Sequence, residues 1–260
     1  MSELVLQEVA NGVLRLTLND APTRNSLSET MIDELLAILR VTSARVVVIA
    51  SQGPAFSSGH NLKEITAHRS DADEGAAYFK LLFDKCARLM QAIMEHPCPV
   101  IAEIDGLASA AGCQLVASCD LAIATGRSSF CTPGVNIGLF CSTPMVAVSR
   151  VMSRKHAMEL LLTGDVFSAE DAVRMGLINR IVGHNELRAA TDALATKIAS
   201  KSSAAIRIGK QAFDAQLDMP MATAYTFMAQ IMADNLLVDD AKEGIGAFIQ
   251  KRHPDWAQDT

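Results

Sequence analysis

Two short segments near the start of the chain alternate apolar and polar residues. They cover residues 4–9 and 13–18, and Asn11-Gly12 lies between them. A period of two is typical of a half-buried β-strand, and Asn-Gly favours a two-residue turn with positive φ at both positions. The pattern therefore predicts a β-hairpin.

Three later runs are apolar almost throughout, over residues 45–50, 100–104 and 120–124. Such runs are typical of strands buried on both faces. Helical patterns lie before and between these runs, over residues 28–40, over 73–95, and in a short apolar stretch that ends at Ser118. Strands that alternate with helices predict crossover connections in a mainly parallel sheet. Ser26 followed by Glu29 predicts a capping box for the helix over 28–40.

Helical patterns dominate after Arg150. Ser168 with Asp171 predicts a second capping box, and Gly176 suits the end of the helix that follows. A last strand is predicted over 178–182. We expect an α/β core over residues 1–200 and a C-terminal helical region over 201–260. The predicted helices in this half cover residues 154–162, 169–175, 186–200, 204–217 and 222–235.

Composition excludes several classes of function. The 260 residues carry a net charge of -6, which argues against a nucleic-acid surface. No apolar run is long enough to span a membrane. The six cysteines form no CxxC pair and have no histidine at zinc-ligand spacing, so we expect reduced, buried thiols and no metal. The first residues lack the pattern of a signal peptide, and we expect a cytoplasmic protein.

Two loops rich in Gly, Ala and Ser follow buried strands, over residues 54–64 and 105–115. Helix N-termini offer unpaired N–H groups, so two neighbouring strand-to-helix junctions can direct two donors at one oxygen. That is the arrangement of an oxyanion hole. Alternatively, the small residues serve only to let helices pack closely on the sheet. Composition alone leaves both interpretations open.

The sequence resembles the crotonase superfamily, which includes enoyl-CoA hydratases and isomerases, along essentially its whole length. Single motifs are weak, but their order and spacing together are specific. The run over 129–144 is most similar to one branch of this superfamily. The matching segments cover residues 22–27, 56–62, 99–106, 111–115, 119–120, 162–165, 172–177 and 242–248.

The resemblance implies a spiral of ββα units and a C-terminal helical oligomerisation region, with assembly as a homotrimer or homohexamer. It implies an acyl-CoA thioester as partner, with no cofactor beyond the coenzyme A of the substrate. The backbone N–H groups of His60 and Ala111 would hold the thioester oxygen. Further substrate contacts are expected at Ser58, Leu62, Lys63 and Gly112.

The sequence departs from the family pattern at two positions. Ordinary hydratases of this kind carry glutamates where this chain has Gln114 and Gly134. Neither residue present can take or deliver a proton, so ordinary hydration should be crippled, and glutamates at both positions should raise it. The other candidate groups nearby are His60, Asn136, Cys141 and Ser142.

Three functional hypotheses follow. The first is an enzyme of the hydratase/isomerase family, including an isomerase or thioesterase, that uses another proton carrier. His60 could serve as this base, or only its backbone could matter. The second is a non-catalytic acyl-CoA-binding protein. The third, a Clp-type serine peptidase, fails because Ala110 falls where its serine would stand and no histidine lies between His96 and His156.

Overall fold

The N-terminal hairpin forms as its sequence predicts. The structure is a computed structural model, and it describes residues 3–256. Strand β1 (Val5–Ala10) pairs antiparallel with β2 (Val13–Leu18). The turn residues Asn11 and Gly12 have φ values of 53° and 76°. Both lie in the left-handed region that an Asn-Gly turn requires.

The hairpin begins a six-stranded sheet of order β1-β2-β3-β5-β7-β10. Apart from the antiparallel β1–β2 pair, all neighbouring strands in this sheet are parallel. A second, four-stranded sheet has the order β4-β6-β8-β9, and only its last pair is antiparallel. The first sheet adds β3 (Val46–Ser51), β5 (Val100–Ile104), β7 (Leu121–Thr125) and β10 (Arg180–Val182) to the hairpin; the second contains β4 (Ala55–Ser57), β6 (Leu107–Ser109), β8 (Ser129–Cys131) and β9 (Phe167–Ser168).

A strand–strand–helix unit repeats three times along the chain. In each unit, a long strand of the first sheet is followed by a short strand of the second sheet and then by helical structure. Because β4, β6 and β8 are parallel neighbours, the three segments that follow them begin at the same edge of the second sheet. These segments lead into α2 (Leu62–Ala67) with α3 (Ala76–Met94), into α4 (Ala111–Ser118), and through a 3-10 turn into α5 (Ser142–Val151).

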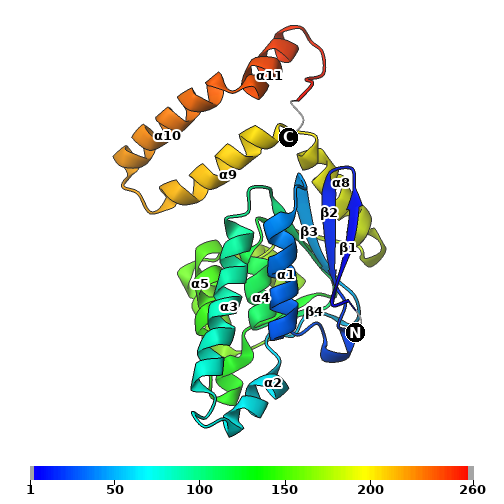
Figure 1. The fold of residues 1–260 in the computed structure, drawn as a ribbon, viewed down its shortest axis with the longest axis vertical. Coiled ribbons are helices and arrows are strands. Elements are labelled where there is room, and N and C mark those ends of the chain that lie inside the picture. Colours follow the sequence, from blue (N-terminus) through cyan, green and yellow to red (C-terminus); the bar gives the residue numbers. More distant parts are fainter. Residues whose placement is uncertain (1–2, 257–260) are drawn as a thin grey trace.

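The first sheet is covered on both faces. Helices α1 (Glu29–Val41), α3 and α4 lie on one side of it and α8 (Leu187–Ala199) lies on the other (Figure 1). Val46, Val48 and Ile101 pack with Ala195 on the α8 side.

The capping box predicted from Ser26 is wrong. The cap of α1 is Ser28, which accepts a hydrogen bond from the Met31 amide, because the Leu27 amide is bonded to the Gly59 carbonyl and holds residues 26–27 outside the helix.

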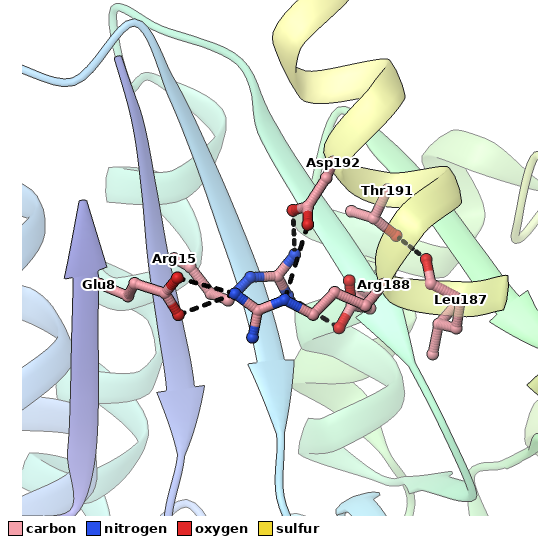
Figure 2. Close-up of polar contacts among 7 residues, drawn as sticks. Glu8, Arg15, Leu187, Arg188, Thr191 and Asp192 are labelled. Carbon is pink, nitrogen blue, oxygen red and sulfur yellow. Dashed lines mark hydrogen bonds and ion pairs between the residues drawn. The ribbon is translucent and has the colours of Figure 1, made fainter. Parts of the chain in front are cut away.

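Charged side chains fix α8 on the sheet (Figure 2). Arg15 on β2 is 4% exposed and pairs with Glu103 of β5 at 2.7 Å and with Asp192 of α8 at 2.6 Å. Arg188, one turn earlier on α8, reaches Glu8 on β1 at 2.8 Å. A buried guanidinium needs paired acceptors, so Asp192 and Glu103 together set where α8 lies.

The last three helices form a C-terminal arm, defined as α9 (Ser203–Leu217), α10 (Met221–Leu237) and α11 (Asp239–Ile249). The arm extends from the end of the core opposite α2 (Figure 1). Lys210 anchors it, because its Nζ donates to Asp120 at 2.7 Å and to the Ile93 carbonyl at 3.2 Å. Residues 1–2 and 257–260, at the outer limits of the two predicted regions, lie outside the described residues.

The helices between the core strands and the arm follow the sequence pattern closely. α6 (Arg154–Thr163) and α7 (Ala169–Met175) form where they were predicted, and the Ser168–Asp171 capping box is confirmed. Gly176 ends α7 with a φ of 88°. Over residues 3–256, no helix is both long and apolar enough to cross a membrane.

Candidate active site

The two Gly/Ala loops singled out from the sequence meet at the edge where β4 and β6 end. A Cβ built on Gly59 would lie 3.0 Å from the Ala111 nitrogen and 2.9 Å from the Ser109 carbonyl oxygen. A Cβ built on Gly112 would lie only 2.4 Å from the Ser57 carbonyl oxygen. The loop after β4 therefore lies directly against the first turn of α4, and glycine is required on both sides of the contact.

Two backbone amides at this junction have no acceptor in the described part of the chain. They belong to His60, after β4, and to Ala111, the first residue of α4. Ala110 before it has φ 50° and ψ −115°, an unusual conformation for a residue with a side chain, while its own amide donates to the Cys131 carbonyl. Strain of this kind concentrates at functional sites. Here it sets the direction of the Ala111 N–H.

The His60 imidazole is held in one tautomer. Its Nδ1 lies 3.2 Å from the Leu27 carbonyl oxygen, which can only accept, so Nδ1 carries the proton. Its Nε2 is buried and has no partner within residues 3–256. Burial lowers the pKa of the imidazole below its ordinary value, and the bond to Leu27 opposes this shift. Phe83 of α3 packs edge-on against the ring at a centroid distance of 5.3 Å.

Gln114 lies one turn into α4 and is 3% exposed. Its Oε1 is 4.0 Å from the thiol of Cys86 on α3, the limit for a weak bond in which sulfur donates. Burial raises the pKa of that thiol to about 12, so it stays protonated. The neutral amide at position 114 therefore faces a neutral thiol.

The packing around Gly134 bears on the expectation that glutamates at positions 114 and 134 would raise hydration. Gly134 is buried in the 3-10 turn after β8. A Cβ added there would lie 2.9 Å from both the Cys141 sulfur and the Leu139 carbonyl oxygen. The turn over residues 139–141 thus occupies the space that a side chain at 134 would need. Burial raises the pKa of the Cys141 thiol, which is therefore neutral as well.

The other two polar candidates on this segment are exposed. Asn136 lies on the surface beside Gly164, where a Cβ would come within 3.0 Å of its Nδ2. Ser142 begins α5 and donates to the Phe140 carbonyl at 3.3 Å. Neither makes a bond to His60 or Gln114 in the described chain. Large apolar side chains lie exposed between them instead: Ile137, Leu139 and Phe140.

The predicted coenzyme A contacts lie along the start of α2. Ser58 is tied to the preceding loop, since its Oγ donates to the Thr23 carbonyl at 3.1 Å. Leu62 is 53% exposed at the first position of α2, and Lys63 follows it on the surface. Gly112 differs from these, because its missing side chain is what allows α4 to pack on β4.

Sequence reasoning missed Leu27 and Phe83, the two residues that hold the His60 ring. Leu27 lies within one of the family motifs, but it contacts His60 through its backbone carbonyl, and any residue type could make this contact. Phe83 is one apolar position among many on α3. As for metals, no group of three or more His, Cys, Asp or Glu side chains in the described residues could hold an ion.

Comparisons with known proteins agree with this architecture. The family model described as enoyl-CoA hydratase/isomerase matches residues 8–259. A Mus musculus protein named enoyl-CoA hydratase domain-containing protein 3, mitochondrial, is 47% identical over 95% of this chain and 82% of its own length. The crystal structure of the human protein of that name has a TM-score of 0.92 at 44% identity and covers 98% of this chain and 100% of its own.

An enoyl-CoA hydratase of Mycobacterium smegmatis superposes with a TM-score of 0.91 at 43% identity, covering 98% of this chain and 99% of its own. The similarity to the domain-containing protein 3 branch, predicted from the run over 129–144, is confirmed. The expected cytoplasmic location is contradicted, because relatives from five vertebrates carry the word mitochondrial in their names.

The family model, the relatives and the shared spiral of strand–strand–helix units lead to one conclusion: the chain belongs to the enoyl-CoA hydratase/isomerase family and has the crotonase fold.

Proposed function

We propose that this protein is an enzyme that binds an acyl-CoA thioester and holds the thioester oxygen between the backbone N–H groups of His60 and Ala111. The observation that carries the proposal is the pair of amides without acceptors at one strained junction. Donors fixed in this way stabilise an enolate without reorganising as charge develops on the oxygen. The positive end of the α4 dipole lies at Ala111 and adds to the effect.

The remainder of the substrate would lie along α2. Lys63 offers a positive charge at the surface, suited to a phosphate of coenzyme A, and Leu62 offers an exposed apolar contact to the pantetheine arm. Ser58 and Gly112 would contact the substrate through backbone atoms, because the Ser58 hydroxyl donates to the Thr23 carbonyl and Gly112 has no side chain. Relatives named as probable enoyl-CoA hydratases support the ligand class.

The carbonyl of the ligand should contribute directly to its affinity. Butyryl-CoA is expected to bind about 10-fold or more tightly than S-butyl-CoA, which has a CH₂ in place of the C=O, because two hydrogen bonds of about 1 kcal/mol each are lost. Titration calorimetry with both ligands measures the ratio. Free coenzyme A serves as the control for contacts outside the acyl group. Equal affinities for the two ligands would contradict the proposed oxyanion hole. If neither ligand binds, acyl-CoA thioesters are excluded as the ligand class.

One observation favours a second candidate, a non-catalytic acyl-CoA-binding protein. The space beside Gly134 is filled by Cys141 and Leu139, and the amide at Gln114 cannot transfer a proton. A protein built in this way could bind and polarise a thioester without converting it. The two candidates differ in whether a C–H bond of the bound acyl chain is broken. Deuterium exchange at the α-carbon of butyryl-CoA measures this difference.

We also propose that the arm assembles copies of the chain into a trimer or hexamer. Met221 and Tyr225 on α10 are 74% and 73% exposed, and Phe248 on α11 is 85% exposed. Exposed large apolar side chains gathered on one region are typical of an interaction surface. Light scattering at micromolar concentration is expected to give three or six copies. A monomer under these conditions would contradict the assembly while leaving the ligand proposal intact.

A further inference from the structure

The His60 side chain is an unusual feature of the candidate site, because it is neutral, fixed in orientation and incompletely bonded. Three hydrogen bonds join the loop after β4 to the segment before α1. The Ser58 amide donates to the Arg24 carbonyl at 2.9 Å, and the Leu27 amide donates to the Gly59 carbonyl at 2.8 Å. His60 Nδ1 donates to the Leu27 carbonyl at 3.2 Å. With the proton on Nδ1, the lone pair lies on Nε2.

That lone pair has no bonding partner in residues 3–256, although Nε2 is buried. Buried polar atoms without partners are uncommon, and each one carries a free-energy penalty that a fold normally avoids. Charged groups on the neighbouring helices include Lys63 and Glu64 on α2 and Lys80 and Asp84 on α3. Lys80 pairs with Asp84, and Glu64 accepts from the Glu29 amide. The pKa of His60 is shifted by burial and by the Leu27 bond, with no charged neighbour among the causes.

We propose that His60 Nε2 is the catalytic base that removes the α-proton of the bound acyl thioester. The inference rests on the proposed function, because it requires the thioester oxygen to lie at the His60 and Ala111 amides. The residue that binds this oxygen also carries the imidazole, and the α-carbon is only two bonds from the oxygen. We therefore expect Nε2 to act on the α-hydrogen rather than on the distant end of the chain.

The step balances without any further reactant. The Nε2 lone pair takes the α-proton, the C–H electron pair forms the Cα=C bond, and the carbonyl π electrons move to the oxygen. The resulting enolate oxygen is held by the two backbone N–H groups. The imidazolium then returns a proton to the α-carbon, or exchanges it with solvent first. Phe83 packs edge-on against the imidazole and is itself 39% exposed, so we expect its ring to move when the acyl chain binds.

Deuterium exchange tests this role directly. The intact protein is incubated with butyryl-CoA in D₂O, and proton NMR follows loss of the α-CH₂ signal. His60→Asn is the matched variant, because the asparagine amide can still donate to the Leu27 carbonyl while Nε2 is removed. Its exchange rate is expected to fall by about 10²–10⁴-fold, the typical contribution of one general base. Calorimetric affinity for butyryl-CoA should change little, because the backbone donors remain.

The pH profile separates a base from a structural histidine. Wild-type exchange should be lost as pH falls through the pKa of His60, which lies below its ordinary value of 6.5, because the imidazolium has no lone pair. His60→Asn and His60→Gln should both lack this inflection. Melting temperatures of the variants show whether they fold.

Each outcome has a distinct meaning. Exchange that is lost in folded, ligand-binding His60→Asn supports the inference. Equal exchange in wild type and variant, or tight binding with no wild-type exchange, overturns it and leaves acyl-CoA binding standing. If butyryl-CoA fails to bind the wild-type protein, the proposed function itself fails.

Discussion

Crotonyl-CoA is expected to be hydrated at least about 10²-fold more slowly than by a relative that carries both glutamates. Addition of water at the β-carbon needs a base for the water and an acid for the α-carbon, and each typically contributes about 10²–10⁴-fold. The proposed His60 imidazolium can fill only the second of these roles. Gln114 can orient a water but cannot take its proton, and Gly134 has no side chain. Loss of the enoyl thioester absorbance at matched enzyme concentration measures the difference.

A single variant sharpens this expectation. Gln114→Glu alone should raise hydration, because it places a carboxylate on α4 without disturbing the turn after β8. Gln114→Asp is the matched control, since it adds the same charge on a shorter side chain. Brisk hydration by the wild-type protein would show that another group acts as base and acid, and would make the two family positions irrelevant to its chemistry.

Gly112→Ala is expected to destabilise the protein by about 3 kcal/mol, at the upper end for overpacked sites. The added Cβ would lie 2.4 Å from the Ser57 carbonyl oxygen and 2.8 Å from the Ser57 Cβ. Backbone cannot yield as a flexible side chain can, so α4 must move away from β4. The Ala111 amide moves with it, and affinity for butyryl-CoA should fall as well. Urea denaturation and calorimetry measure the two effects.

The control for this substitution lies on the arm. Gly209 is an exposed helical residue of α9, and apart from the adjoining helix backbone no atom lies within 4 Å of its potential Cβ. Gly209→Ala should therefore stabilise the protein by about 0.5–1 kcal/mol through helix propensity alone. The same chemical change is thus expected to have opposite signs at two helical positions. Equal effects at both would contradict the close packing of α4 on β4.

Much of the fold was predictable because its signals are local. The Asn11-Gly12 turn, the apolar strands of the main sheet and the Ser168 cap each depend on a few neighbouring residues. The strands of the second sheet were missed, because three residues are too few to show a period. α11 was missed too, since Gly244 and Gly246 weaken its helical pattern. The α1 cap was misplaced because a long-range contact to Gly59 decides it.

The candidate site was predictable to a smaller extent. Residue patterns and family resemblance indicated which loops would meet, and they do meet. Side-chain environment was beyond reach: the lone pair of His60 depends on Leu27 and Phe83, which are distant in sequence. The obstruction at Gly134 comes from the path of the backbone over residues 139–141, which no single residue type specifies.

That obstruction also constrains how this protein can change in evolution. Two of the four glycine codons are one nucleotide away from a glutamate codon, so a glutamate can arise at such positions by a single mutation. In this protein it would meet the Leu139 carbonyl and the Cys141 sulfur at 2.9 Å and would first lower stability. A glutamate at this position would be tolerated only after the 139–141 turn had been reshaped by other substitutions. Packing at this turn therefore disfavours a carboxylate at position 134 independently of any effect on the chemistry.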